Sequence, residues 1–473
     1  MIASSHIAQL RALLDDNGLL TEPGDMVPYQ TGARHDEGRA AFVARPSSTI
    51  AVSRLLAYCC RNEIALVPQG GNTGLVGGSI PDMTGAQGVL SLDRLRKIFE
   101  PDIFNRSVRV DAGLRLSEIN ARLAPHRLFF PIDLGADPTA GGMVSTNTGG
   151  ARFIRFGDVR RNVLGLKVVL ADDEGTILNL GTGLRKDNTG PDWKHLFIGT
   201  SGAFGVVTEC ELNLERLLNQ SATAYLVPRS DSHVMALLAA LEEHLGSQLS
   251  AFEGMSGSAI RHALAHSPAL KNPFPGGQVP SFVILVEVSR SWTRRSTEEP
   301  LEALLETALE EIWRDPAEPL IDAFVGPPRE MWGLRHALSE GVKAAGHLVA
   351  FDLAFRRGDS MRFRTQMESR LSTCFPTVEI CDFGHIGDGG IHFNLVIAEN
   401  PGEAVEGSLI ESLRHEVNSV AVEMFGGSFS AEHALGRRNQ HLYDRYTPLK
   451  LRRFAAALKQ VTSASELGAV RVS

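Results

Sequence analysis

Two histidines flank a short turn near the C-terminal third of the chain, and their spacing suits a metal ion. In EICDFGHIGDGGIHFNLVI, Asp388 and Gly389 stand between two apolar runs, a pattern that favours a two-residue type I′ hairpin turn. Counting outward from that turn pairs His385 with His392, and directly opposed residues have Cβ atoms roughly 4.5 to 5.5 Å apart. Both imidazoles could therefore reach one divalent ion. Asn394 would share their face because side chains alternate along a strand.

Two histidines alone make an incomplete metal site. Transition metals in proteins usually take three or more protein ligands together with water or substrate. The same pair can also stack or hydrogen-bond inside a core hairpin, so the two residues leave both interpretations open. A third ligand has to come from elsewhere in the chain.

Two glycine-rich passages are the second chemical feature. PQGGNTGLVGGS covers residues 68–79 and GADPTAGGMVSTNTGGARFIRFGD covers residues 135–158. Glycine lets a backbone approach a phosphate closely and adopt positive φ angles, so such loops can direct N–H groups at a pyrophosphate. In the first passage, Asn72 and Thr73 add amide and hydroxyl donors. That passage contains neither GxGxxG nor GxxxxGK[ST], which removes the main support for a nicotinamide or ATP site. Both passages are expected to be loops or tight turns.

Hydrophobic periodicity and turn signals divide the chain into three parts. An α+β region over residues 1–217 contains a helical pattern leading into the strand IALV and a hairpin, VLGLKVVLADDEGTILNL. Residues 218–425 alternate helical stretches such as HVMALLAALEEHL with apolar strands such as SFVILVEVS, which indicates a separate substrate domain. The last segment, residues 426–473, begins with glycine and continues as a charged amphipathic helix. We expect it to pack back against the first region.

Composition excludes several classes of function. The chain has 473 residues with 47 basic and 55 acidic side chains, and its net charge of −8 opposes binding to nucleic acid or anionic lipid. Its five cysteines lack a CxxC spacing, which is typical of core residues in a reducing compartment. No run approaches the roughly 20 apolar residues of a transmembrane helix. The N-terminus lacks the pattern of a signal peptide, so a cytoplasmic location is expected.

These motifs, in this order, resemble the FAD-linked oxidoreductases of the vanillyl-alcohol oxidase and para-cresol methylhydroxylase superfamily, especially the D-2-hydroxyglutarate and D-lactate dehydrogenase branch. The likeness covers nearly the whole chain and includes GTSGAFGVVTE and SAEHALG besides the glycine passages and the hairpin. It implies an α+β fold with a two-part FAD-binding domain and a substrate, or cap, domain in which helices flank an antiparallel sheet. It also implies oxidation of a D-2-hydroxy acid to a 2-oxo acid, with hydride passing to flavin N5.

The resemblance implies which residues bind FAD. The first passage would hold the pyrophosphate and the second would run along the flavin, while Val207 would touch the flavin through its backbone. This chain has Ser201 and Ala203 where the family usually has Glu and Thr. No loop position is the His or Cys that carries covalent flavin in some relatives, so FAD is expected to be non-covalent. The implied loop residues are Pro68, Gly70, Gly71, Asn72, Thr73, Gly74, Gly77, Gly78, Pro138, Thr139, Gly141, Gly142, Ser145, Asn147, Gly149 and Gly157.

The resemblance also supplies the third metal ligand, Glu432 in SAEHALG, which would join His385 and His392. Zinc is expected, although manganese and iron also suit these ligand types. A metal ion on the substrate's hydroxyl group lowers the pKa of that group. His433 could then take the proton, since imidazole has an unperturbed pKa of about 6.5.

Two residues of MWGLRHALSE complete the implied catalytic set, which also includes Asn394. Arg335 matches the family's arginine for the substrate carboxylate, a role that suits the planar guanidinium. Ser339 stands where a hydroxyl residue is common.

Several positions depart from the family pattern. Relatives often have lysine where this chain has Ala350, and Ala434, Asn439 and Gly390 replace an expected glycine, lysine and asparagine. The chain also lacks the usual DPxGxxNPGK ending. These departures keep two alternatives open: a metal-independent flavin alcohol oxidase of the same superfamily, and a catalytically silent flavin-binding subunit. Expected partners are a small 2-hydroxy acid, an electron acceptor such as an electron-transfer flavoprotein, quinone or cytochrome, and a second copy in a homodimer.

Overall fold

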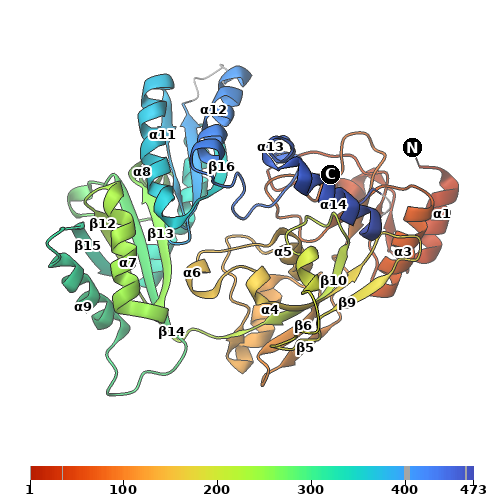
Figure 1. Ribbon diagram of the computed structural model, residues 1–473, viewed down its shortest axis with the longest axis horizontal. Helices are drawn as coiled ribbons and strands as arrows, with labels where there is room; N and C mark the ends of the chain where they lie inside the picture. The colour runs from red at the N-terminus through yellow and green to blue at the C-terminus, as the bar shows by residue number, and fades with distance from the viewer. Residues whose placement is uncertain (1, 35, 399–404, 464–465, 473) are drawn as a thin grey trace. The chain divides into compact units, whose positions relative to one another are not determined.

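The computed structural model describes residues 2–34, 36–398, 405–463 and 466–472. The chain forms two compact units, neither of which is one continuous stretch (Figure 1). Unit 1 comprises Met1–Gly149, Asp158–Leu217 and Glu432–Ser473, and unit 2 comprises Gly150–Gly157 and Leu218–Ala431. The structure keeps the expected boundary at residues 217/218. It adds two more, because eight residues of the second glycine passage, Gly150–Gly157, belong to unit 2. The C-terminal segment of unit 1 begins at Glu432 rather than at residue 426.

Unit 1 contains two principal sheets. In the smaller, β2 (Val43–Ala44), β4 (Gly88–Ser91) and β3 (Leu66–Gln69) are parallel, and β1 (Leu19–Leu20) lies antiparallel at the edge. Helix α3 (Thr49–Arg61) packs Leu55 and Leu56 into a core shared with Leu66 and Leu90 of these strands. The helix begins after Ser48, whose hydroxyl accepts a hydrogen bond from the Ala51 N–H and so caps the first turn. Helices α1 (Ser4–Leu13) and α2 (Pro23–Gln30) precede it.

The larger sheet of unit 1 is antiparallel. Its order is β5 (Phe99–Asp102), β6 (Ser107–Asp111), β10 (Val206–Asn213), β8 (Val163–Val169) and β9 (Ile177–Leu180). The pairing of β8 with β9 confirms the expected hairpin. Helices α4 (Leu116–Leu123) and α5 (Ala140–Thr146) bury their apolar side chains against it.

The C-terminal segment joins both sheets of unit 1. It contains α13 (Gln440–Tyr446) and α14 (Leu449–Thr462). Isolated bridges connect Ser463 to Ala171 after β8 and Leu467 to Leu66 in β3. Residues far apart in sequence therefore complete one unit.

Unit 2 is built on an eight-stranded antiparallel sheet in the order β15-β12-β14-β13-β18-β19-β16, with β17 paired to β19. This confirms the antiparallel sheet flanked by helices that the resemblance implied. The strands are β12 (Gln220–Pro228), β13 (Leu249–Ser256), β14 (Phe282–Arg290), β15 (Leu320–Gly326), β16 (His347–Ala354), β17 (Val378–Ile380), β18 (Phe383–Gly384) and β19 (Gly390–Ile397).

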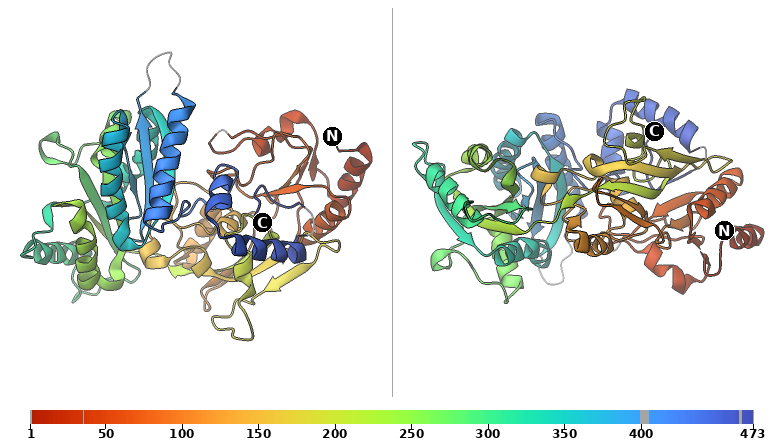
Figure 2. Two further views of the ribbon diagram at one scale, coloured as in Figure 1. Left: turned by 45° about the horizontal axis from the view of Figure 1, so that its top comes forward. Right: turned by 90° about the horizontal axis from the view of Figure 1, so that it is seen from below.

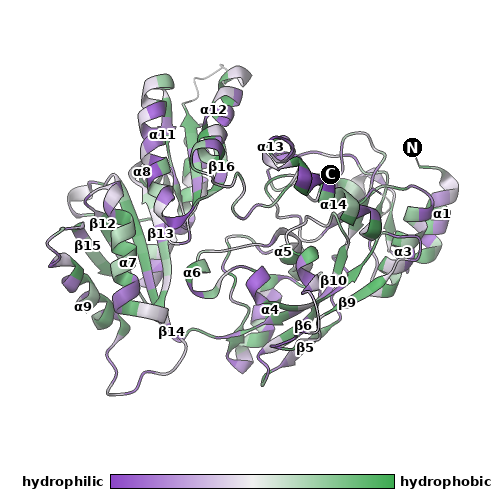
Figure 3. Ribbon diagram, in the orientation of Figure 1, coloured by the Kyte–Doolittle hydropathy of each residue, from purple (hydrophilic) through white to green (hydrophobic). Residues whose placement is uncertain are grey.

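Helices cover both faces of this sheet (Figures 1 and 2). On one face, α7 (Val234–Leu245) and α9 (Leu301–Trp313) pack on alternate residues of β12 and β14, and α11 (Ser360–Cys374) and α12 (Gly407–Ser419) pack on β16 and β19. On the other face lie α8 (Gly257–His266) and α10 (Pro328–Ala344). Because both faces are covered, every residue of β14 is buried, its three polar residues included. Figure 3 shows these strands mostly green, whereas α11 and α12 alternate green and purple.

Two arginines attach the short segment Gly150–Gly157, with its helix α6 (Phe153–Phe156), to the sheet of unit 2. Arg152 forms a bidentate ion pair with the buried carboxylate of Glu287 on β14, with Nε–Oε1 at 2.7 Å and Nη2–Oε2 at 2.9 Å. Arg155 donates to both the carbonyl and the hydroxyl oxygen of Ser289 at 2.6 Å. Among the helices that the structure describes, none is long and apolar enough to cross a bilayer.

Candidate active site

The candidate catalytic residues of unit 2 lie on the sheet face that carries α8 and α10. In β19, His392 and Asn394 alternate with Phe393, whose ring packs into the opposite core. Antiparallel pairing with β16 sets Asp352 opposite His392 and Ala350 opposite Asn394. The sheet therefore gathers an acid, an imidazole and an amide from two neighbouring strands.

The expected register of the histidine hairpin is wrong. Phe383, rather than His385, lies opposite His392, because residues 386–389 form a wider turn in which the Gly390 N–H donates to the His385 carbonyl at 3.1 Å. The physical reason is tertiary: Ile386 is buried in the core, and the Gly387 N–H donates to the Phe252 carbonyl of β13 at 3.1 Å. The two imidazoles nevertheless meet, with ring centroids 5.3 Å apart.

Glu253 of β13 connects His385 to Arg335. One carboxylate oxygen, Oε1, lies 2.7 Å from His385 Nδ1, and the other, Oε2, accepts from Arg335 Nε at 2.9 Å and pairs with Nη2 at 2.7 Å. Burial by itself raises the pKa of Glu253, but His385 and Arg335 outweigh burial and lower this pKa to about 2. The carboxylate is therefore charged, and it fixes the orientation of both partners.

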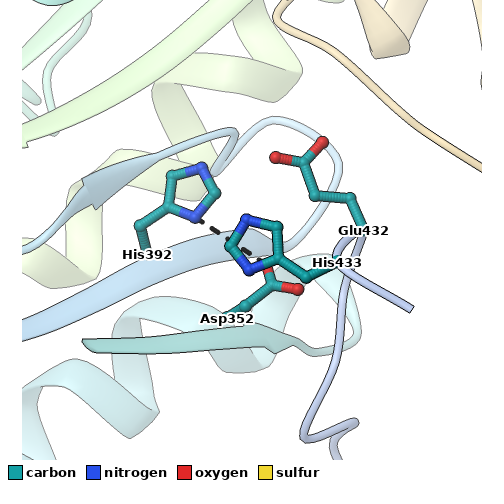
Figure 4. A group of neighbouring side chains, drawn as sticks. All are labelled: Asp352, His392, Glu432 and His433. Atoms are coloured by element: carbon teal, nitrogen blue, oxygen red, sulfur yellow. Dashed lines mark ion pairs between the residues drawn. The ribbon is translucent and has the colours of Figure 1, made fainter. Parts of the chain in front are cut away.

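His392 faces Asp352 across the two strands, with Nδ1 and Oδ1 3.7 Å apart (Figure 4). The other carboxylate oxygen of Asp352 accepts from the Ala431 N–H at 2.9 Å. This bond connects β16 to Ala431. The next two residues, Glu432 and His433, are also labelled in Figure 4. Both are half-buried.

Helix α10 carries the candidate arginine. Arg335 is 8% exposed, and its guanidinium also lies over the Phe383 ring, 5.0 Å from the ring centroid. Ser339 is one helical turn further along and is exposed. Glu253 binds Nε and Nη2, one edge of the guanidinium, and Nη1 lies outside that edge.

The glycine passages of unit 1 lie side by side. A Cβ added to Gly70 would be 2.4 Å from Thr139 Oγ1, so something would have to move, and one on Gly71 would make a tight contact 3.3 Å from the Thr139 nitrogen. At the exposed Gly74, an added Cβ would meet no protein atom within 4 Å. The loops thus present backbone toward open space, which fits the pyrophosphate of FAD.

The expectation that residues 135–158 form only loops and turns is wrong. Residues Ala140–Thr146 are helical as α5. Thr139 caps this helix, because its hydroxyl accepts from the Gly142 N–H at 3.3 Å. At the other end Asn147 has a φ of 52°, a left-handed conformation that ends the helix.

Two of the implied FAD-binding asparagines use their side chains to shape the loops. Asn72 donates to the Thr31 carbonyl at 2.8 Å and accepts from Ser79 at 2.9 Å. Asn147 donates to Asp158 at 2.8 Å. These contacts hold the backbone in place and direct both amide groups at protein atoms.

The remaining implied FAD residues are distributed as follows. Pro68 is in β3, the residues from Pro138 to Gly149 are in the second passage and α5, and Val207 is buried in β10, all within unit 1. Gly157 belongs to unit 2 and has a φ of 73°. Ser201, a departure from the family, donates its hydroxyl to the Leu435 carbonyl at 2.7 Å. The SAEHALG segment and GTSGAFG therefore meet in unit 1.

Sequence patterns left Glu253 and Asp352 without an assigned role. Glu253 is separated from His385 by 132 positions, and only the fold brings them together. One signal was available in the sequence: Glu253 and Glu287 are each the only acid in a strand, LSAFEGMS and FVILVEVSR. A buried acid in an apolar strand requires a cationic partner.

Comparisons with known proteins agree with this geometry. The family model for an FAD binding domain matches residues 40–181, and the model for the C-terminal domain of FAD linked oxidases matches residues 219–462. The second match covers more than half of the chain. This protein therefore belongs to the FAD-linked oxidase family, and it is an FAD-dependent oxidoreductase.

Curated relatives extend over most of the chain. The probable mitochondrial D-2-hydroxyglutarate dehydrogenase of Oryza sativa subsp. japonica is 33% identical over 439 residues, which is 92% of this chain and 76% of the relative. The mitochondrial D-2-hydroxyglutarate dehydrogenase of Arabidopsis thaliana is 31% identical, covering 93% and 77%. The D-2-hydroxyglutarate dehydrogenase of Xanthomonas citri pv. viticola is 30% identical, covering 88% and 86%.

Solved structures share the fold. p-Cresol methylhydroxylase aligns with a TM-score of 0.71 at 15% identity, covering 98% of this chain and 94% of that chain. The 4-ethylphenol oxidase of Gulosibacter chungangensis aligns with a TM-score of 0.72 at 15% identity, covering 98% and 95%. These likenesses confirm the vanillyl-alcohol oxidase type of fold.

Proposed function

We propose that this protein is an FAD-dependent dehydrogenase that oxidises a D-2-hydroxy acid to a 2-oxo acid with the help of a divalent metal ion. The observation that carries the proposal is the carboxylate of Glu253, which holds the candidate metal ligand His385 on one side and the candidate substrate clamp Arg335 on the other. Relatives named D-2-hydroxyglutarate dehydrogenase, at 30–33% identity, support the substrate class.

Part of the donor set fits a metal ion: ligand atoms of His392 and Glu432 lie within 4.8 Å of each other, in a group that also contains Asp352 and His433 but not His385. Metal-binding histidines typically give one ring nitrogen to a carboxylate, which fixes the ring and makes the other nitrogen a better ligand. His385 has this arrangement through Nδ1, and His392 is its neighbour at 5.3 Å between ring centroids. Glu432 is the proposed third ligand, since it follows Ala431, whose N–H is bound to Asp352 opposite His392.

Arg335 is the proposed clamp for the substrate carboxylate. Glu253 takes the Nε–Nη2 edge, so Nη1 is the nitrogen proposed for the substrate. A guanidinium held in this way loses little rotamer entropy on binding an anion. Asn394, on the same sheet face as His392, adds an amide group that can hydrogen-bond a substrate oxygen.

His433 is the proposed base. It would take the proton of the substrate's hydroxyl group as the hydride leaves the adjoining carbon. When bound, the metal ion lowers the pKa of that hydroxyl group and the flavin accepts the hydride. The protein's part is to orient the substrate between Arg335, Asn394 and His433.

Anaerobic stopped-flow absorbance tests the proposal. The flavoprotein is mixed with a panel of D- and L-2-hydroxy acids, before and after metal removal and after reconstitution. We expect one D-acid to bleach the flavin, and metal removal to abolish bleaching. Bleaching that survives strong chelation would instead identify a metal-independent oxidase, and flavin that no acid reduces in a metal-replete sample would identify a silent subunit.

Glu253→Gln tests the observation that carries the proposal. Losing the carboxylate beside His385 should weaken metal binding by about 10- to 100-fold. Glu242→Gln is the matched control, because Glu242 pairs with Arg357 on the surface of the same unit. If Glu253→Gln and Glu242→Gln bind metal equally tightly, the Glu253 carboxylate does not contribute to the metal site.

A further inference from the structure

We propose that unit 2 carries a second metal site, formed by His262, Glu379 and Cys381, for a thiophilic divalent cation such as Zn²⁺. One ligand atom from each residue lies within 4.8 Å of the others. None of the three belongs to the catalytic site proposed above. The second site therefore stands independently of the proposed function.

Local structure places the three side chains together. Glu379 is in β17 and Cys381 follows two positions later, so both point to the same side of the extended chain. His262 lies on α8, which packs against β17. The Cys381 N–H donates to the Asn394 carbonyl at 2.8 Å, and Ser258 donates its hydroxyl to the Ile380 carbonyl. These bonds fix both polar groups of the peptide that joins Ile380 to Cys381 before any ion binds.

The ligand types and their burial suit zinc. Sulfur and imidazole together select zinc over magnesium or calcium, which prefer oxygen. Cys381 is fully buried, while the side chains of His262 and Glu379 are 28% and 45% exposed. The thiol would anchor the ion from the inside and the exposed pair would admit it from solvent. Three protein ligands leave a fourth tetrahedral position for water.

The charged groups around the cluster allow a cation to enter. His262 Nε2 and Glu379 Oε2 are 2.7 Å apart, and the ion would take the place of this contact. Arg261 lies 3.6 Å from the other Glu379 oxygen, but its side chain is 56% exposed and can turn toward solvent. The neighbouring carboxylate of Asp382 is engaged by Arg364 at 2.8 Å. On binding, the Cys381 thiol would release its proton to solvent as the sulfur–metal bond forms, with no electron transfer.

X-ray absorption at the zinc edge tests the site directly. The chelator-stripped flavoprotein is loaded with Zn²⁺, and we expect a sulfur scatterer at about 2.3 Å. Cys381→Ser should remove that scatterer, whereas Cys374→Ser should keep it, because Cys374 is exposed and lies outside the cluster. His392→Asn should keep it too. The last variant separates this site from the catalytic one, which offers only nitrogen and oxygen ligands.

His262→Gln and Glu379→Gln provide a second measurement that does not disturb the core. Competition with a chromophoric chelator should show Zn²⁺ binding at the sulfur site at least ten-fold weaker in each variant. The proposal is overturned if wild-type zinc has only nitrogen and oxygen neighbours, if the sulfur signal follows Cys374, or if both surface variants bind Zn²⁺ as the wild type does.

Discussion

The side-chain amide of Asn439 donates a hydrogen bond to the carbonyl oxygen of Ala434 at 2.9 Å, and its oxygen accepts from the Gly436 N–H at 2.8 Å. Ala434 has a φ of 63°, the left-handed region that favours glycine. The two residues are both departures from the family, which usually has glycine and lysine at these positions. The structure shows that they belong together: the buried amide of Asn439 braces the strained turn that follows His433.

Ala434→Gly should therefore stabilise unit 1. The left-handed conformation costs a non-glycine residue roughly 1–2 kcal/mol, and the greater freedom of glycine in the unfolded chain takes back about 0.5–1 kcal/mol. We expect a net gain of about 0.5–1 kcal/mol, measured by chemical denaturation. Asn439→Ala should be destabilising, and less so when it is combined with Ala434→Gly in a double variant. Strictly additive effects would show that the two positions are not coupled.

Gly74→Ala should separate cofactor binding from folding. The new methyl group meets no protein atom within 4 Å, so the thermal stability of the apoprotein should not change. It would project into the space assigned to FAD, and we expect at least ten-fold weaker FAD binding in a fluorescence titration. Gly24→Ala, equally free of neighbours but on α2, serves as the control. Unchanged FAD affinity in Gly74→Ala would remove this loop from the cofactor site.

Glu287→Gln should destabilise unit 2 and change its response to acid. Burial raises the pKa of Glu287, but hydrogen bonds and charge from Arg152, with Ser250 and Trp332, outweigh burial and lower the pKa. Because the folded pKa lies below the unfolded value of about 4.3, the stabilisation is complete above that pH and is lost as pH falls through the folded pKa.

At neutral pH, breaking this buried pair should cost about 3–5 kcal/mol. Stability measured against pH should then fall less steeply below about pH 4.3 in Glu287→Gln than in the wild type. Glu310→Gln, which removes an exposed pair with Arg314, should leave both quantities nearly unchanged. If stability falls equally steeply with decreasing pH in Glu287→Gln and in the wild type, the lowered pKa of Glu287 does not contribute to the acid sensitivity of the protein.

Ala350→Lys should shift substrate preference toward hydroxy dicarboxylates. Ala350 is half-buried opposite Asn394, on the sheet face of His392, so a lysine there would bring an ammonium group to the proposed substrate site. A new charged hydrogen bond contributes about 1.5–3 kcal/mol, which corresponds to roughly 10- to 150-fold in relative kcat/KM. Ala350→Met matches the length without the charge. If both variants change the relative kcat/KM for hydroxy dicarboxylates equally, the size of the side chain rather than its charge is responsible.

Sequence patterns were sufficient for the parts of the fold that depend on local order. The β8–β9 hairpin follows from two apolar runs around Asp173–Gly175. The glycine passages indicated a phosphate-binding loop, and the resemblance to the FAD-linked oxidoreductases then supplied FAD as the cofactor. The spacing of His385 and His392 around their turn predicted that the two imidazoles lie close together, and their ring centroids are 5.3 Å apart. These features depend on residues close together in the chain.

What the sequence did not reveal depends on tertiary contacts. The hairpin register shifted because the core captures Ile386 and the Gly387 N–H finds a partner in β13. The sequence did not predict helix α5, because the two glycines in it have low helix propensity. Thr139 and Asn147 nevertheless cap its two ends. Glu253 lies next to His385 because β13 pairs with β18, the strand that precedes His385. No local pattern encodes such a neighbour.

The chain passes between the units at four points, so unit 2 cannot be transferred to another protein as one continuous segment. A fragment limited to residues 218–431 would contain the whole eight-stranded sheet yet lack Arg152, leaving the carboxylate of Glu287 buried without its cation. A chimaera between relatives would have to exchange Gly150–Gly157 together with Leu218–Ala431, so recombination needs four compatible junctions at once. The second glycine passage and the eight-stranded sheet are thus constrained to change in concert, even though each unit has its own core.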